Sequence, residues 1–283
     1  MGGTPEFTPI SEQPLTPELP PRPSYAQRIQ RAHDLADRYS SAAELLRFYA
    51  RLAFHQQHIF ESLAASEVRD ETWTLHLELI LPLFPDFVRS LTEISPAPLR
   101  DRAAELASAD IAEQTHVLTE FWNNGFAQDS LTTAAADRFL SLAFLQPYSE
   151  WLAQPASNSS GAPGQSTCPV CGSEPICAVL RDRGHGAGRS LVCSLCMYEW
   201  SFLRVVCPAC GEERFESLPV FTSQEMPHVR IDACDTCHHY INTIDMTKDG
   251  LAVPVVDELA AVSLDLWAAE NHYQKLTANI AGI

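Results

Sequence analysis

The first 167 residues of this 283-residue chain contain no cysteine, whereas all nine cysteines lie between Cys168 and Cys237. Such a change in composition marks a boundary between two parts of a chain, and the length suits about two domains. The Ser/Gly/Pro-rich stretch 155–166 carries no charge and is typical of a linker. We therefore expect a cysteine-free N-terminal part and a cysteine-bearing C-terminal part.

Long apolar runs and basic runs are also lacking. No stretch approaches the ~18 apolar residues of a membrane span, and the Pro-rich residues 1–23 have no apolar signal segment and read as a disordered tail. We therefore expect a cytosolic protein with reduced thiols. The 19 Lys+Arg against 36 Asp+Glu argue against nucleic-acid binding, which favours a basic face.

Motifs for catalysis are the third absence. The sequence has no Gly-rich phosphate loop, no paired carboxylates in a convincing motif and no convincing nucleophile–base pair. We therefore predict that the chain is not an enzyme.

Residues 24–154 have the apolar periodicity of helices. One segment places Leu45, Tyr49, Leu52, Ile59 and Leu63 on one helical face. A more apolar segment contains Pro82 and Pro85, which predict a break or kink. Asp110 is a candidate N-cap for the helix that follows it. These patterns predict an antiparallel helical domain.

The C-terminal residues 251–283 predict one more helix. Pro254 suits a first helical turn, and the apolar positions after it follow steps of four and three. These positions are Val255, Leu259, Val262, Leu266, Ala269, Tyr273 and Leu276. A stripe of this kind predicts a single amphipathic helix packed on the rest of the protein.

Eight of the cysteines form four C-x2-C pairs, separated by 21, 10 and 23 residues. The pairs are Cys168/Cys171, Cys193/Cys196, Cys207/Cys210 and Cys234/Cys237. The spacing divides the region into two repeats, 167–206 and 207–250. Within each repeat, "PICAVL" and "RSLV", or "FESLPVF" and "VRID", predict a hairpin, and "YEWSFLRVV" or "YINTIDM" predicts a third strand.

This spacing predicts two metal sites with four cysteines each. A C-x2-C turn brings two sulfurs onto one tight loop, and a hairpin places a second such loop opposite, which suits zinc or a single iron. A ~40-residue repeat buries too little apolar surface to be stable without such a staple. Two alternatives stay open, namely ligands interleaved between the repeats and disulfides, although a reducing compartment disfavours the latter. The ninth cysteine, Cys177, is expected to be a small buried apolar residue.

The segments "CPVCGSEP", "LVCSLCMYEWSFLRVVCPACG", "DACDTCHHYI" and "LDLWAAENHYQKLTANIAG" resemble the formate dehydrogenase accessory (FdhE-like) proteins over roughly 167–283. The resemblance implies an α+β fold, with a helical domain before two tandem rubredoxin-like or zinc-ribbon modules and a C-terminal helix. It also implies a cytoplasmic maturation factor, or chaperone, that binds the formate dehydrogenase catalytic subunit. The eight paired cysteines would then hold two metal ions, with iron favoured and zinc possible.

Three other functions remain as alternatives. A rubredoxin-like electron-transfer protein would use iron as its main chemistry. A nucleic-acid-binding zinc ribbon is disfavoured because 168–247 has six Arg and no Lys against ten Asp+Glu. A thiol–disulfide chaperone would need one cysteine pair that is exposed and free of metal.

Overall fold

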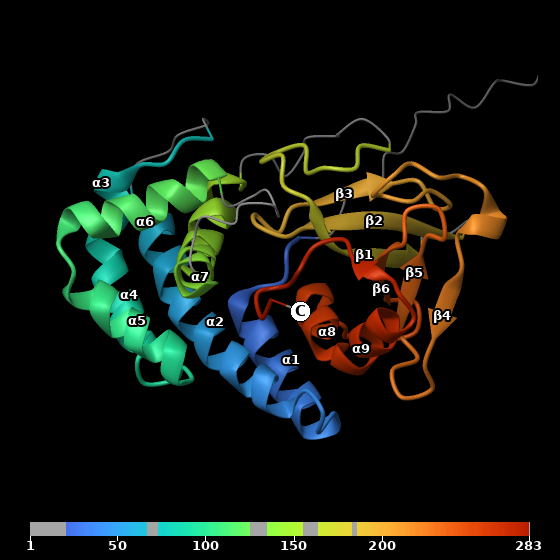
Figure 1. The fold of residues 1–283 in the computed structure, drawn as a ribbon, viewed down its shortest axis with the longest axis horizontal. Coiled ribbons are helices and arrows are strands. Elements are labelled where there is room, and N and C mark those ends of the chain that lie inside the picture. Colours follow the sequence, from blue (N-terminus) through green and yellow to red (C-terminus); the bar gives the residue numbers. More distant parts are fainter. Residues whose placement is uncertain (1–20, 67–72, 125–134, 155–163, 183–185, 283) are drawn as a thin grey trace, which may run out of the picture.

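The computed structural model describes residues 21–66, 73–124, 135–154, 164–182 and 186–282, and within them the chain is α+β. Figure 1 shows a helical half beside a half built on one sheet. The predicted tail up to residue 20 and most of the predicted linker, 155–163, lie outside the described residues. The helices are α1 (Tyr25–Arg38), α2 (Ala43–Ala64), α3 (Leu77–Ile80), η1 (Leu81–Leu83), α4 (Phe84–Leu91), α5 (Ala97–Ser108), α6 (Ile111–Asn124), α7 (Ala135–Leu152), η3 (Phe215–Ser217), α8 (Pro254–Ala260) and α9 (Val262–Glu270).

The helical half follows the sequence pattern closely. Four of the five residues predicted to form the buried face of α2 are buried. The exception is Leu45, whose neighbour Leu46 is fully buried in its place. The break predicted at Pro82 and Pro85 is present, because α3 passes through the short η1 turn into α4. Asp110 caps α6 as predicted, since its carboxylate accepts from the amide of Glu113 at 2.9 Å.

A buried ion pair ties α1 to α7. The Arg28 guanidinium donates to both carboxylate oxygens of Glu150 at 2.7 Å, and the Tyr25 hydroxyl donates to the same carboxylate at 3.0 Å. Arg22, which belongs to the predicted tail, donates to the backbone carbonyls of Glu150 and Ala153 at the end of α7. Because the last carbonyls of a helix have no partner within the helix, Arg22 completes that terminus.

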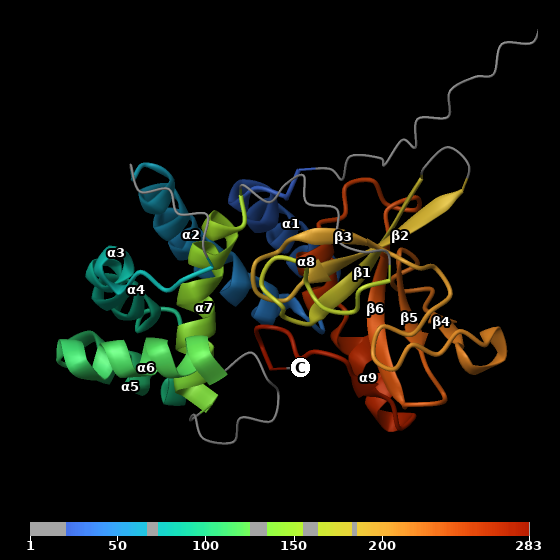
Figure 2. The same ribbon diagram turned by 90° about the horizontal axis from the view of Figure 1, so that it is seen from above.

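The strands form one sheet rather than two separate ones. They are β1 (Pro175–Asp182), β2 (Ala187–Cys193), β3 (Glu199–Phe202), β4 (Val220–Thr222), β5 (Val229–Ala233), β6 (His239–Asp245) and β7 (Gln274–Lys275). Each repeat supplies three antiparallel strands, and β1 and β6 join the two sets in parallel. The order is β3-β2-β1-β6-β5-β4, with β7 added beside β6 (Figure 2).

The second repeat departs from its predicted strands in one place. The segment "FESLPVF" was expected to be a strand throughout, but Phe215–Ser217 form a 3-10 turn and only Val220–Thr222 pair with β5. Pro219 lies directly before the short strand. Since proline has no amide to donate, Pro219 contributes only its carbonyl, which accepts from the amide of Ala233 at 3.0 Å.

The C-terminal segment is helical but is not the single helix that the apolar stripe predicts. α8 ends at Ala260, α9 ends at Glu270, and the chain then turns into β7. His272 has a left-handed backbone with φ of 65°, which a helix cannot contain. Tyr273 and Leu276 therefore belong to the strand region, and α8 packs on α1, β1 and β6.

Two apolar cores hold the halves together. One joins α4–α7 and the later part of α2 to the first cysteine repeat, and the other joins α1 and the start of α2 to β5, β6, α8 and α9. Within the described part of the chain, no helix combines the length and apolar character needed to cross a bilayer.

Candidate metal centres

All four C-x2-C turns fold in the same way. In each, the amide of the first cysteine donates to the carbonyl of the residue five positions later, at 2.8–2.9 Å. The residue after the second cysteine has positive φ, with values of 79° at Gly172, 76° at Gly211, 55° at Met197 and 58° at His238. Glycine adopts this conformation without steric cost, so the two Cys-Pro-x-Cys-Gly copies fit the turn better than their partners do.

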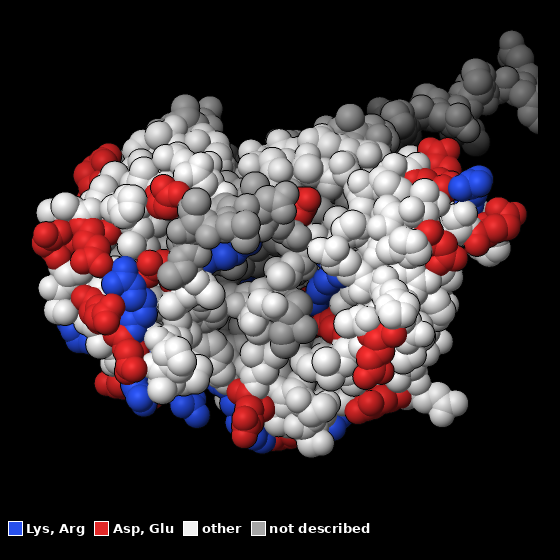
Figure 3. All heavy atoms as spheres, in the orientation of Figure 1, with Lys and Arg blue, Asp and Glu red and all other residues white. Residues whose placement is uncertain are grey.

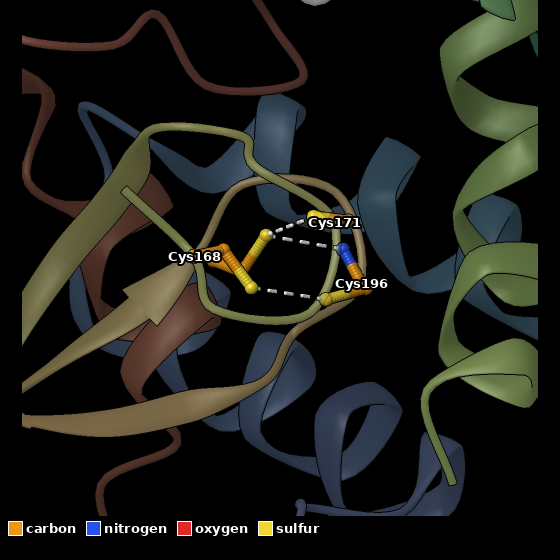
Figure 4. Close-up of side chains that lie close together, drawn as sticks. Cys168, Cys171 and Cys196 are labelled. Carbon is orange, nitrogen blue, oxygen red and sulfur yellow. Dashed lines mark hydrogen bonds between the residues drawn. The ribbon is translucent and has the colours of Figure 1, made fainter. Parts of the chain in front are cut away.

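The first repeat brings its four cysteines together. The Sγ atoms of Cys168 and Cys196 are 3.6 Å apart, and those of Cys171 and Cys193 are 3.3 Å apart. Figure 4 shows Cys168, Cys171 and Cys196 directed toward one another from two facing loops. The amides of Leu195 and Cys196 each lie 3.4 Å from the Cys193 sulfur, a contact that favours the thiolate although burial opposes it.

The second repeat makes an equivalent cluster. Cys207 and Cys237 are 3.7 Å apart at their sulfurs, and so are Cys210 and Cys234. In both clusters, all four ligand atoms lie within 4.8 Å of one another. The sulfurs gather within each repeat rather than between the repeats, in agreement with the sequence expectation. All nine cysteines are free.

These distances fit a tetrahedral four-sulfur site. Metal–sulfur bonds of 2.3 Å, the usual length for zinc, give a tetrahedron with sulfur–sulfur edges of about 3.8 Å. Three of the separations, at 3.6 and 3.7 Å, are close to this edge, and the 3.3 Å between Cys171 and Cys193 is shorter. The clusters are therefore compatible with two metal sites, although ligation by these eight residues stays a prediction. The sulfur set suits zinc or iron and does not distinguish them.

The thiol pKa values differ within the clusters. Contacts with Cys168, Cys193 and Cys196 lower the pKa of Cys171, whereas burial raises the pKa of Cys193. In the second cluster, burial raises the pKa of Cys207 to about 11 although backbone amides oppose it. A bound cation would favour thiolates at all of these positions.

The two clusters differ in their surroundings. In the first, Cys168, Cys193 and Cys196 are at most 1% exposed, and Leu195 and Tyr198 beside them belong to the core shared with the helical half. The second cluster is open to the surface on one side, although Cys207 and Cys234 are buried. Cys210 is exposed, and the residues equivalent to Leu195 and Tyr198 are the exposed Thr236 and the half-buried His239.

The other candidate residues take no part in the clusters. Cys177 is fully buried in β1 among apolar side chains, as predicted, and burial raises the pKa of its thiol. His238 and His239 follow Cys237 but do not join its group.

Sequence reasoning missed one group of possible ligands. His228, Asp249 and Asp257 come together, with His228 Nε2 2.8 Å from the Asp257 carboxylate. Arg31 of α1 already occupies this group, since it contacts Asp249 at 2.7 Å and pairs with Asp257. The group is thus an ion-pair cluster that ties α1 to α8. Arg31 and His228 lie far in sequence from the two aspartates, so no local motif predicts this group.

Acidic and basic side chains are mixed on the protein surface. On the face shown in Figure 3, basic side chains are scattered among acidic ones and form no continuous patch. This distribution gives phosphate groups no extended basic surface on that face.

Comparison with known proteins agrees with the fold and the clusters. Residues 167–204 match the family described as "FdhE, central domain" and residues 205–281 match "FdhE, C-terminal domain". A protein of Aquifex aeolicus named "Protein FdhE homolog" is 34% identical over 206 residues, covering 72% of this chain and 71% of that protein. The chain belongs to the FdhE family.

Other FdhE relatives extend the similarity into the helical half. The "Protein FdhE homolog" of Stutzerimonas stutzeri is 27% identical over 300 residues, covering 95% of this chain and 92% of that protein. The crystal structure of the FdhE protein from Pseudomonas aeruginosa superposes with a TM-score of 0.70 at 23% identity, covering 92% of this chain and 96% of the other. This likeness shows that the two proteins share the fold.

Proposed function

We propose that this chain is a non-enzymatic, cytoplasmic accessory factor that binds the catalytic subunit of formate dehydrogenase during its maturation. The observation that carries the proposal is the pair of four-sulfur clusters in a chain of the FdhE family. The fused sheet and the shared cores support a rigid platform, since both clusters sit on one set of paired strands. The absence of a catalytic motif from the sequence is in keeping with this role.

We further propose that each cluster holds one metal ion, most naturally iron, through the cysteines of its own repeat. The ligands of the first site are Cys168, Cys171, Cys193 and Cys196, and those of the second are Cys207, Cys210, Cys234 and Cys237. Each ion would hold together the two C-x2-C loops of its repeat, which bury too little apolar surface to be stable by themselves. Anaerobic purification, metal analysis and an absorption spectrum identify the ion.

The role as a factor for formate dehydrogenase is tested by co-purification. A tagged chain expressed with the formate dehydrogenase catalytic subunit should retain that subunit on an affinity column. A Cys168→Ser/Cys207→Ser variant should lose it, because one ligand of each site is removed. Cys177→Ala is the matched control, since it removes a cysteine from neither cluster. Failure of the wild-type chain to retain the subunit would contradict the proposal.

Electron transfer is the second candidate function. Exposure of Cys210 favours it, because electron transfer needs a metal site near the surface. Iron-loaded protein would then bleach and recover reversibly and would pass electrons to an acceptor. Full accessory activity in a colourless zinc form would exclude this role.

A further inference from the structure

A groove lies beside the second cysteine cluster, on the sheet face opposite α9. Its floor is a row of paired residues, Val220 of β4, Asp232 of β5 and Ile241 of β6. The neighbouring Phe221 points the other way and packs on Trp267 of α9. The loop after β3 and the η3 turn form the walls, and the enclosed volume is about 200 Å³. This is on the order of ten times the space that one water molecule needs.

The walls of the groove are apolar and exposed. Phe215 is 75% exposed, Val220 50% and Val205 45%, so three of the nine large exposed apolar residues in the described chain line this one groove. Scattered apolar residues are normal on a protein surface, but a cluster around a hollow is typical of a binding site.

The groove is also locally basic in an acidic protein. Three arginines line it, namely Arg189, Arg204 and Arg230, against the single carboxylate of Asp232. That carboxylate is shared, because Arg230 lies 2.8 Å from it and Arg189 3.3 Å. Among the Arg, Lys, Asp and Glu side chains of the lining, positive charge is therefore in excess, although the chain carries a formal −17.

Arg189 is one of the arginines of the lining, and it also holds one wall of the groove in place. Its side chain is only 2% exposed, and it donates to the carbonyl of Val206 at 2.9 Å, which fixes the loop that forms one wall. Its Nε has no hydrogen-bond partner among the described residues. That atom is also closed to solvent, so Arg189 shapes the wall of the groove, and an entering carboxylate can reach the exposed Arg204 and the partly exposed Arg230.

We propose that this groove docks a partner-protein segment in which apolar side chains alternate with carboxylates. The apolar side chains contact Phe215, Val205 and Val220, and the carboxylates pair with Arg204 and Arg230. Because Cys207 and Pro208 line the same groove, the docked segment lies against the second metal loop. The proposal deepens the function given above and rests on it only for the identity of the partner.

Fluorescence anisotropy with a synthetic probe tests the groove directly. The probe is a fluorescein-labelled octapeptide in which leucine and glutamate alternate, and its controls replace glutamate by lysine or leucine by serine. The full chain should bind the probe more tightly than either control, and added salt should weaken binding. Phe215→Ser and Arg204→Glu should each weaken binding about tenfold or more. Both residues are exposed, so neither change disturbs the core.

Matched variants control for general effects of charge and apolar surface. Leu251→Ser removes an apolar side chain that is 81% exposed and outside the groove, and Arg100→Glu reverses an exposed charge on α5. Both should bind the probe within about twofold of wild type. Equal losses in the controls and the groove variants would overturn the proposal, as would equal binding of the lysine peptide.

Two further outcomes separate this proposal from the proposed function. If wild type and Phe215→Ser/Arg204→Glu retain the formate dehydrogenase catalytic subunit equally, the function stands and the groove proposal fails. If wild type does not retain the subunit, the proposed function fails, and probe binding still tests whether the groove binds an apolar and acidic segment. A dimer in sedimentation that Phe215→Ser converts to monomer would make the groove a contact between two copies, which also overturns the proposal.

Discussion

The two cysteine clusters should release their metal ions at very different rates. A chelator must reach a ligand sulfur before it can remove the ion, and Cys210 of the second cluster is exposed. In the first cluster no ligand is exposed: Cys171 is half-buried, Cys168 is 1% exposed, and Cys193 and Cys196 are fully buried. Release from the first site therefore requires its loops to open away from the helical half.

The size of the difference follows from the side chains that this opening exposes. Leu195 and Tyr198 are 1% and 4% exposed, whereas the equivalent Thr236 and His239 contribute little to either core. Exposing a fully buried large apolar side chain costs about 1.5–3 kcal/mol, so two cost about 3–6 kcal/mol. At about 1.4 kcal/mol for each factor of ten, release from the first site should be about 10²- to 10⁴-fold slower.

The assay is anaerobic transfer of zinc from the fully loaded chain to excess 4-(2-pyridylazo)resorcinol, followed by absorbance. Two phases of equal amplitude are expected, one fast and one slow. Cys210→Ser should load a single ion and show the slow phase alone. A single phase for wild type, or a fast phase that survives in Cys210→Ser, would refute the reasoning from burial.

Three more predictions follow from the buried side chains. Cys177→Ala should still bind two metal ions per chain in elemental analysis, because its thiol joins neither cluster; loss of an ion would contradict the assignment. Glu150→Ala should lower the free energy of unfolding in urea by about 3–5 kcal/mol, since it leaves Arg28 buried without its carboxylate, and Arg28→Met/Glu150→Leu should recover most of the loss. Burial raises the pKa of Glu258 above its usual 4.5, although Lys275 opposes the shift. The folded carboxyl thus keeps a proton that the unfolded chain has lost, and wild-type stability falls as pH rises through this window. Glu258→Gln lacks this loss, so its stability relative to wild type should be higher at pH 7 than at pH 5; the opposite trend in urea titrations would contradict the assigned shift.

The sequence predicts the local parts of the candidate site well. A C-x2-C turn is a short-range structure, and the glycine after it marks the left-handed residue that the turn needs. The grouping of the sulfurs follows because each hairpin returns its second pair to its first. The difference in burial also has a sequence signal, since Leu195 and Tyr198 in one repeat correspond to Thr236 and His239 in the other.

Long-range features were not predicted. The parallel pairing of β1 with β6 joins residues such as Ala178 and Thr243, and nothing in either segment specifies the partner. The apolar stripe after Pro254 predicted one helix, but its members Leu266 and Ala269 are exposed, and α9 buries Leu264, Asp265 and Ala268 instead. The turn at His272 interrupts the helix without a glycine or proline to mark it.

The parallel pairing of β1 with β6 has a consequence for dissecting the protein into fragments. A cut between the repeats, near residue 206, would separate two strands that lie in the middle of the sheet. Each fragment would then have a new edge strand with unpaired amides and carbonyls. This edge, with the apolar Ala178 or Ile244 beside it, would be exposed to water and to other copies of the fragment. Neither repeat is therefore an independent building block, and a tag or fusion partner belongs at the ends of the chain rather than at that junction.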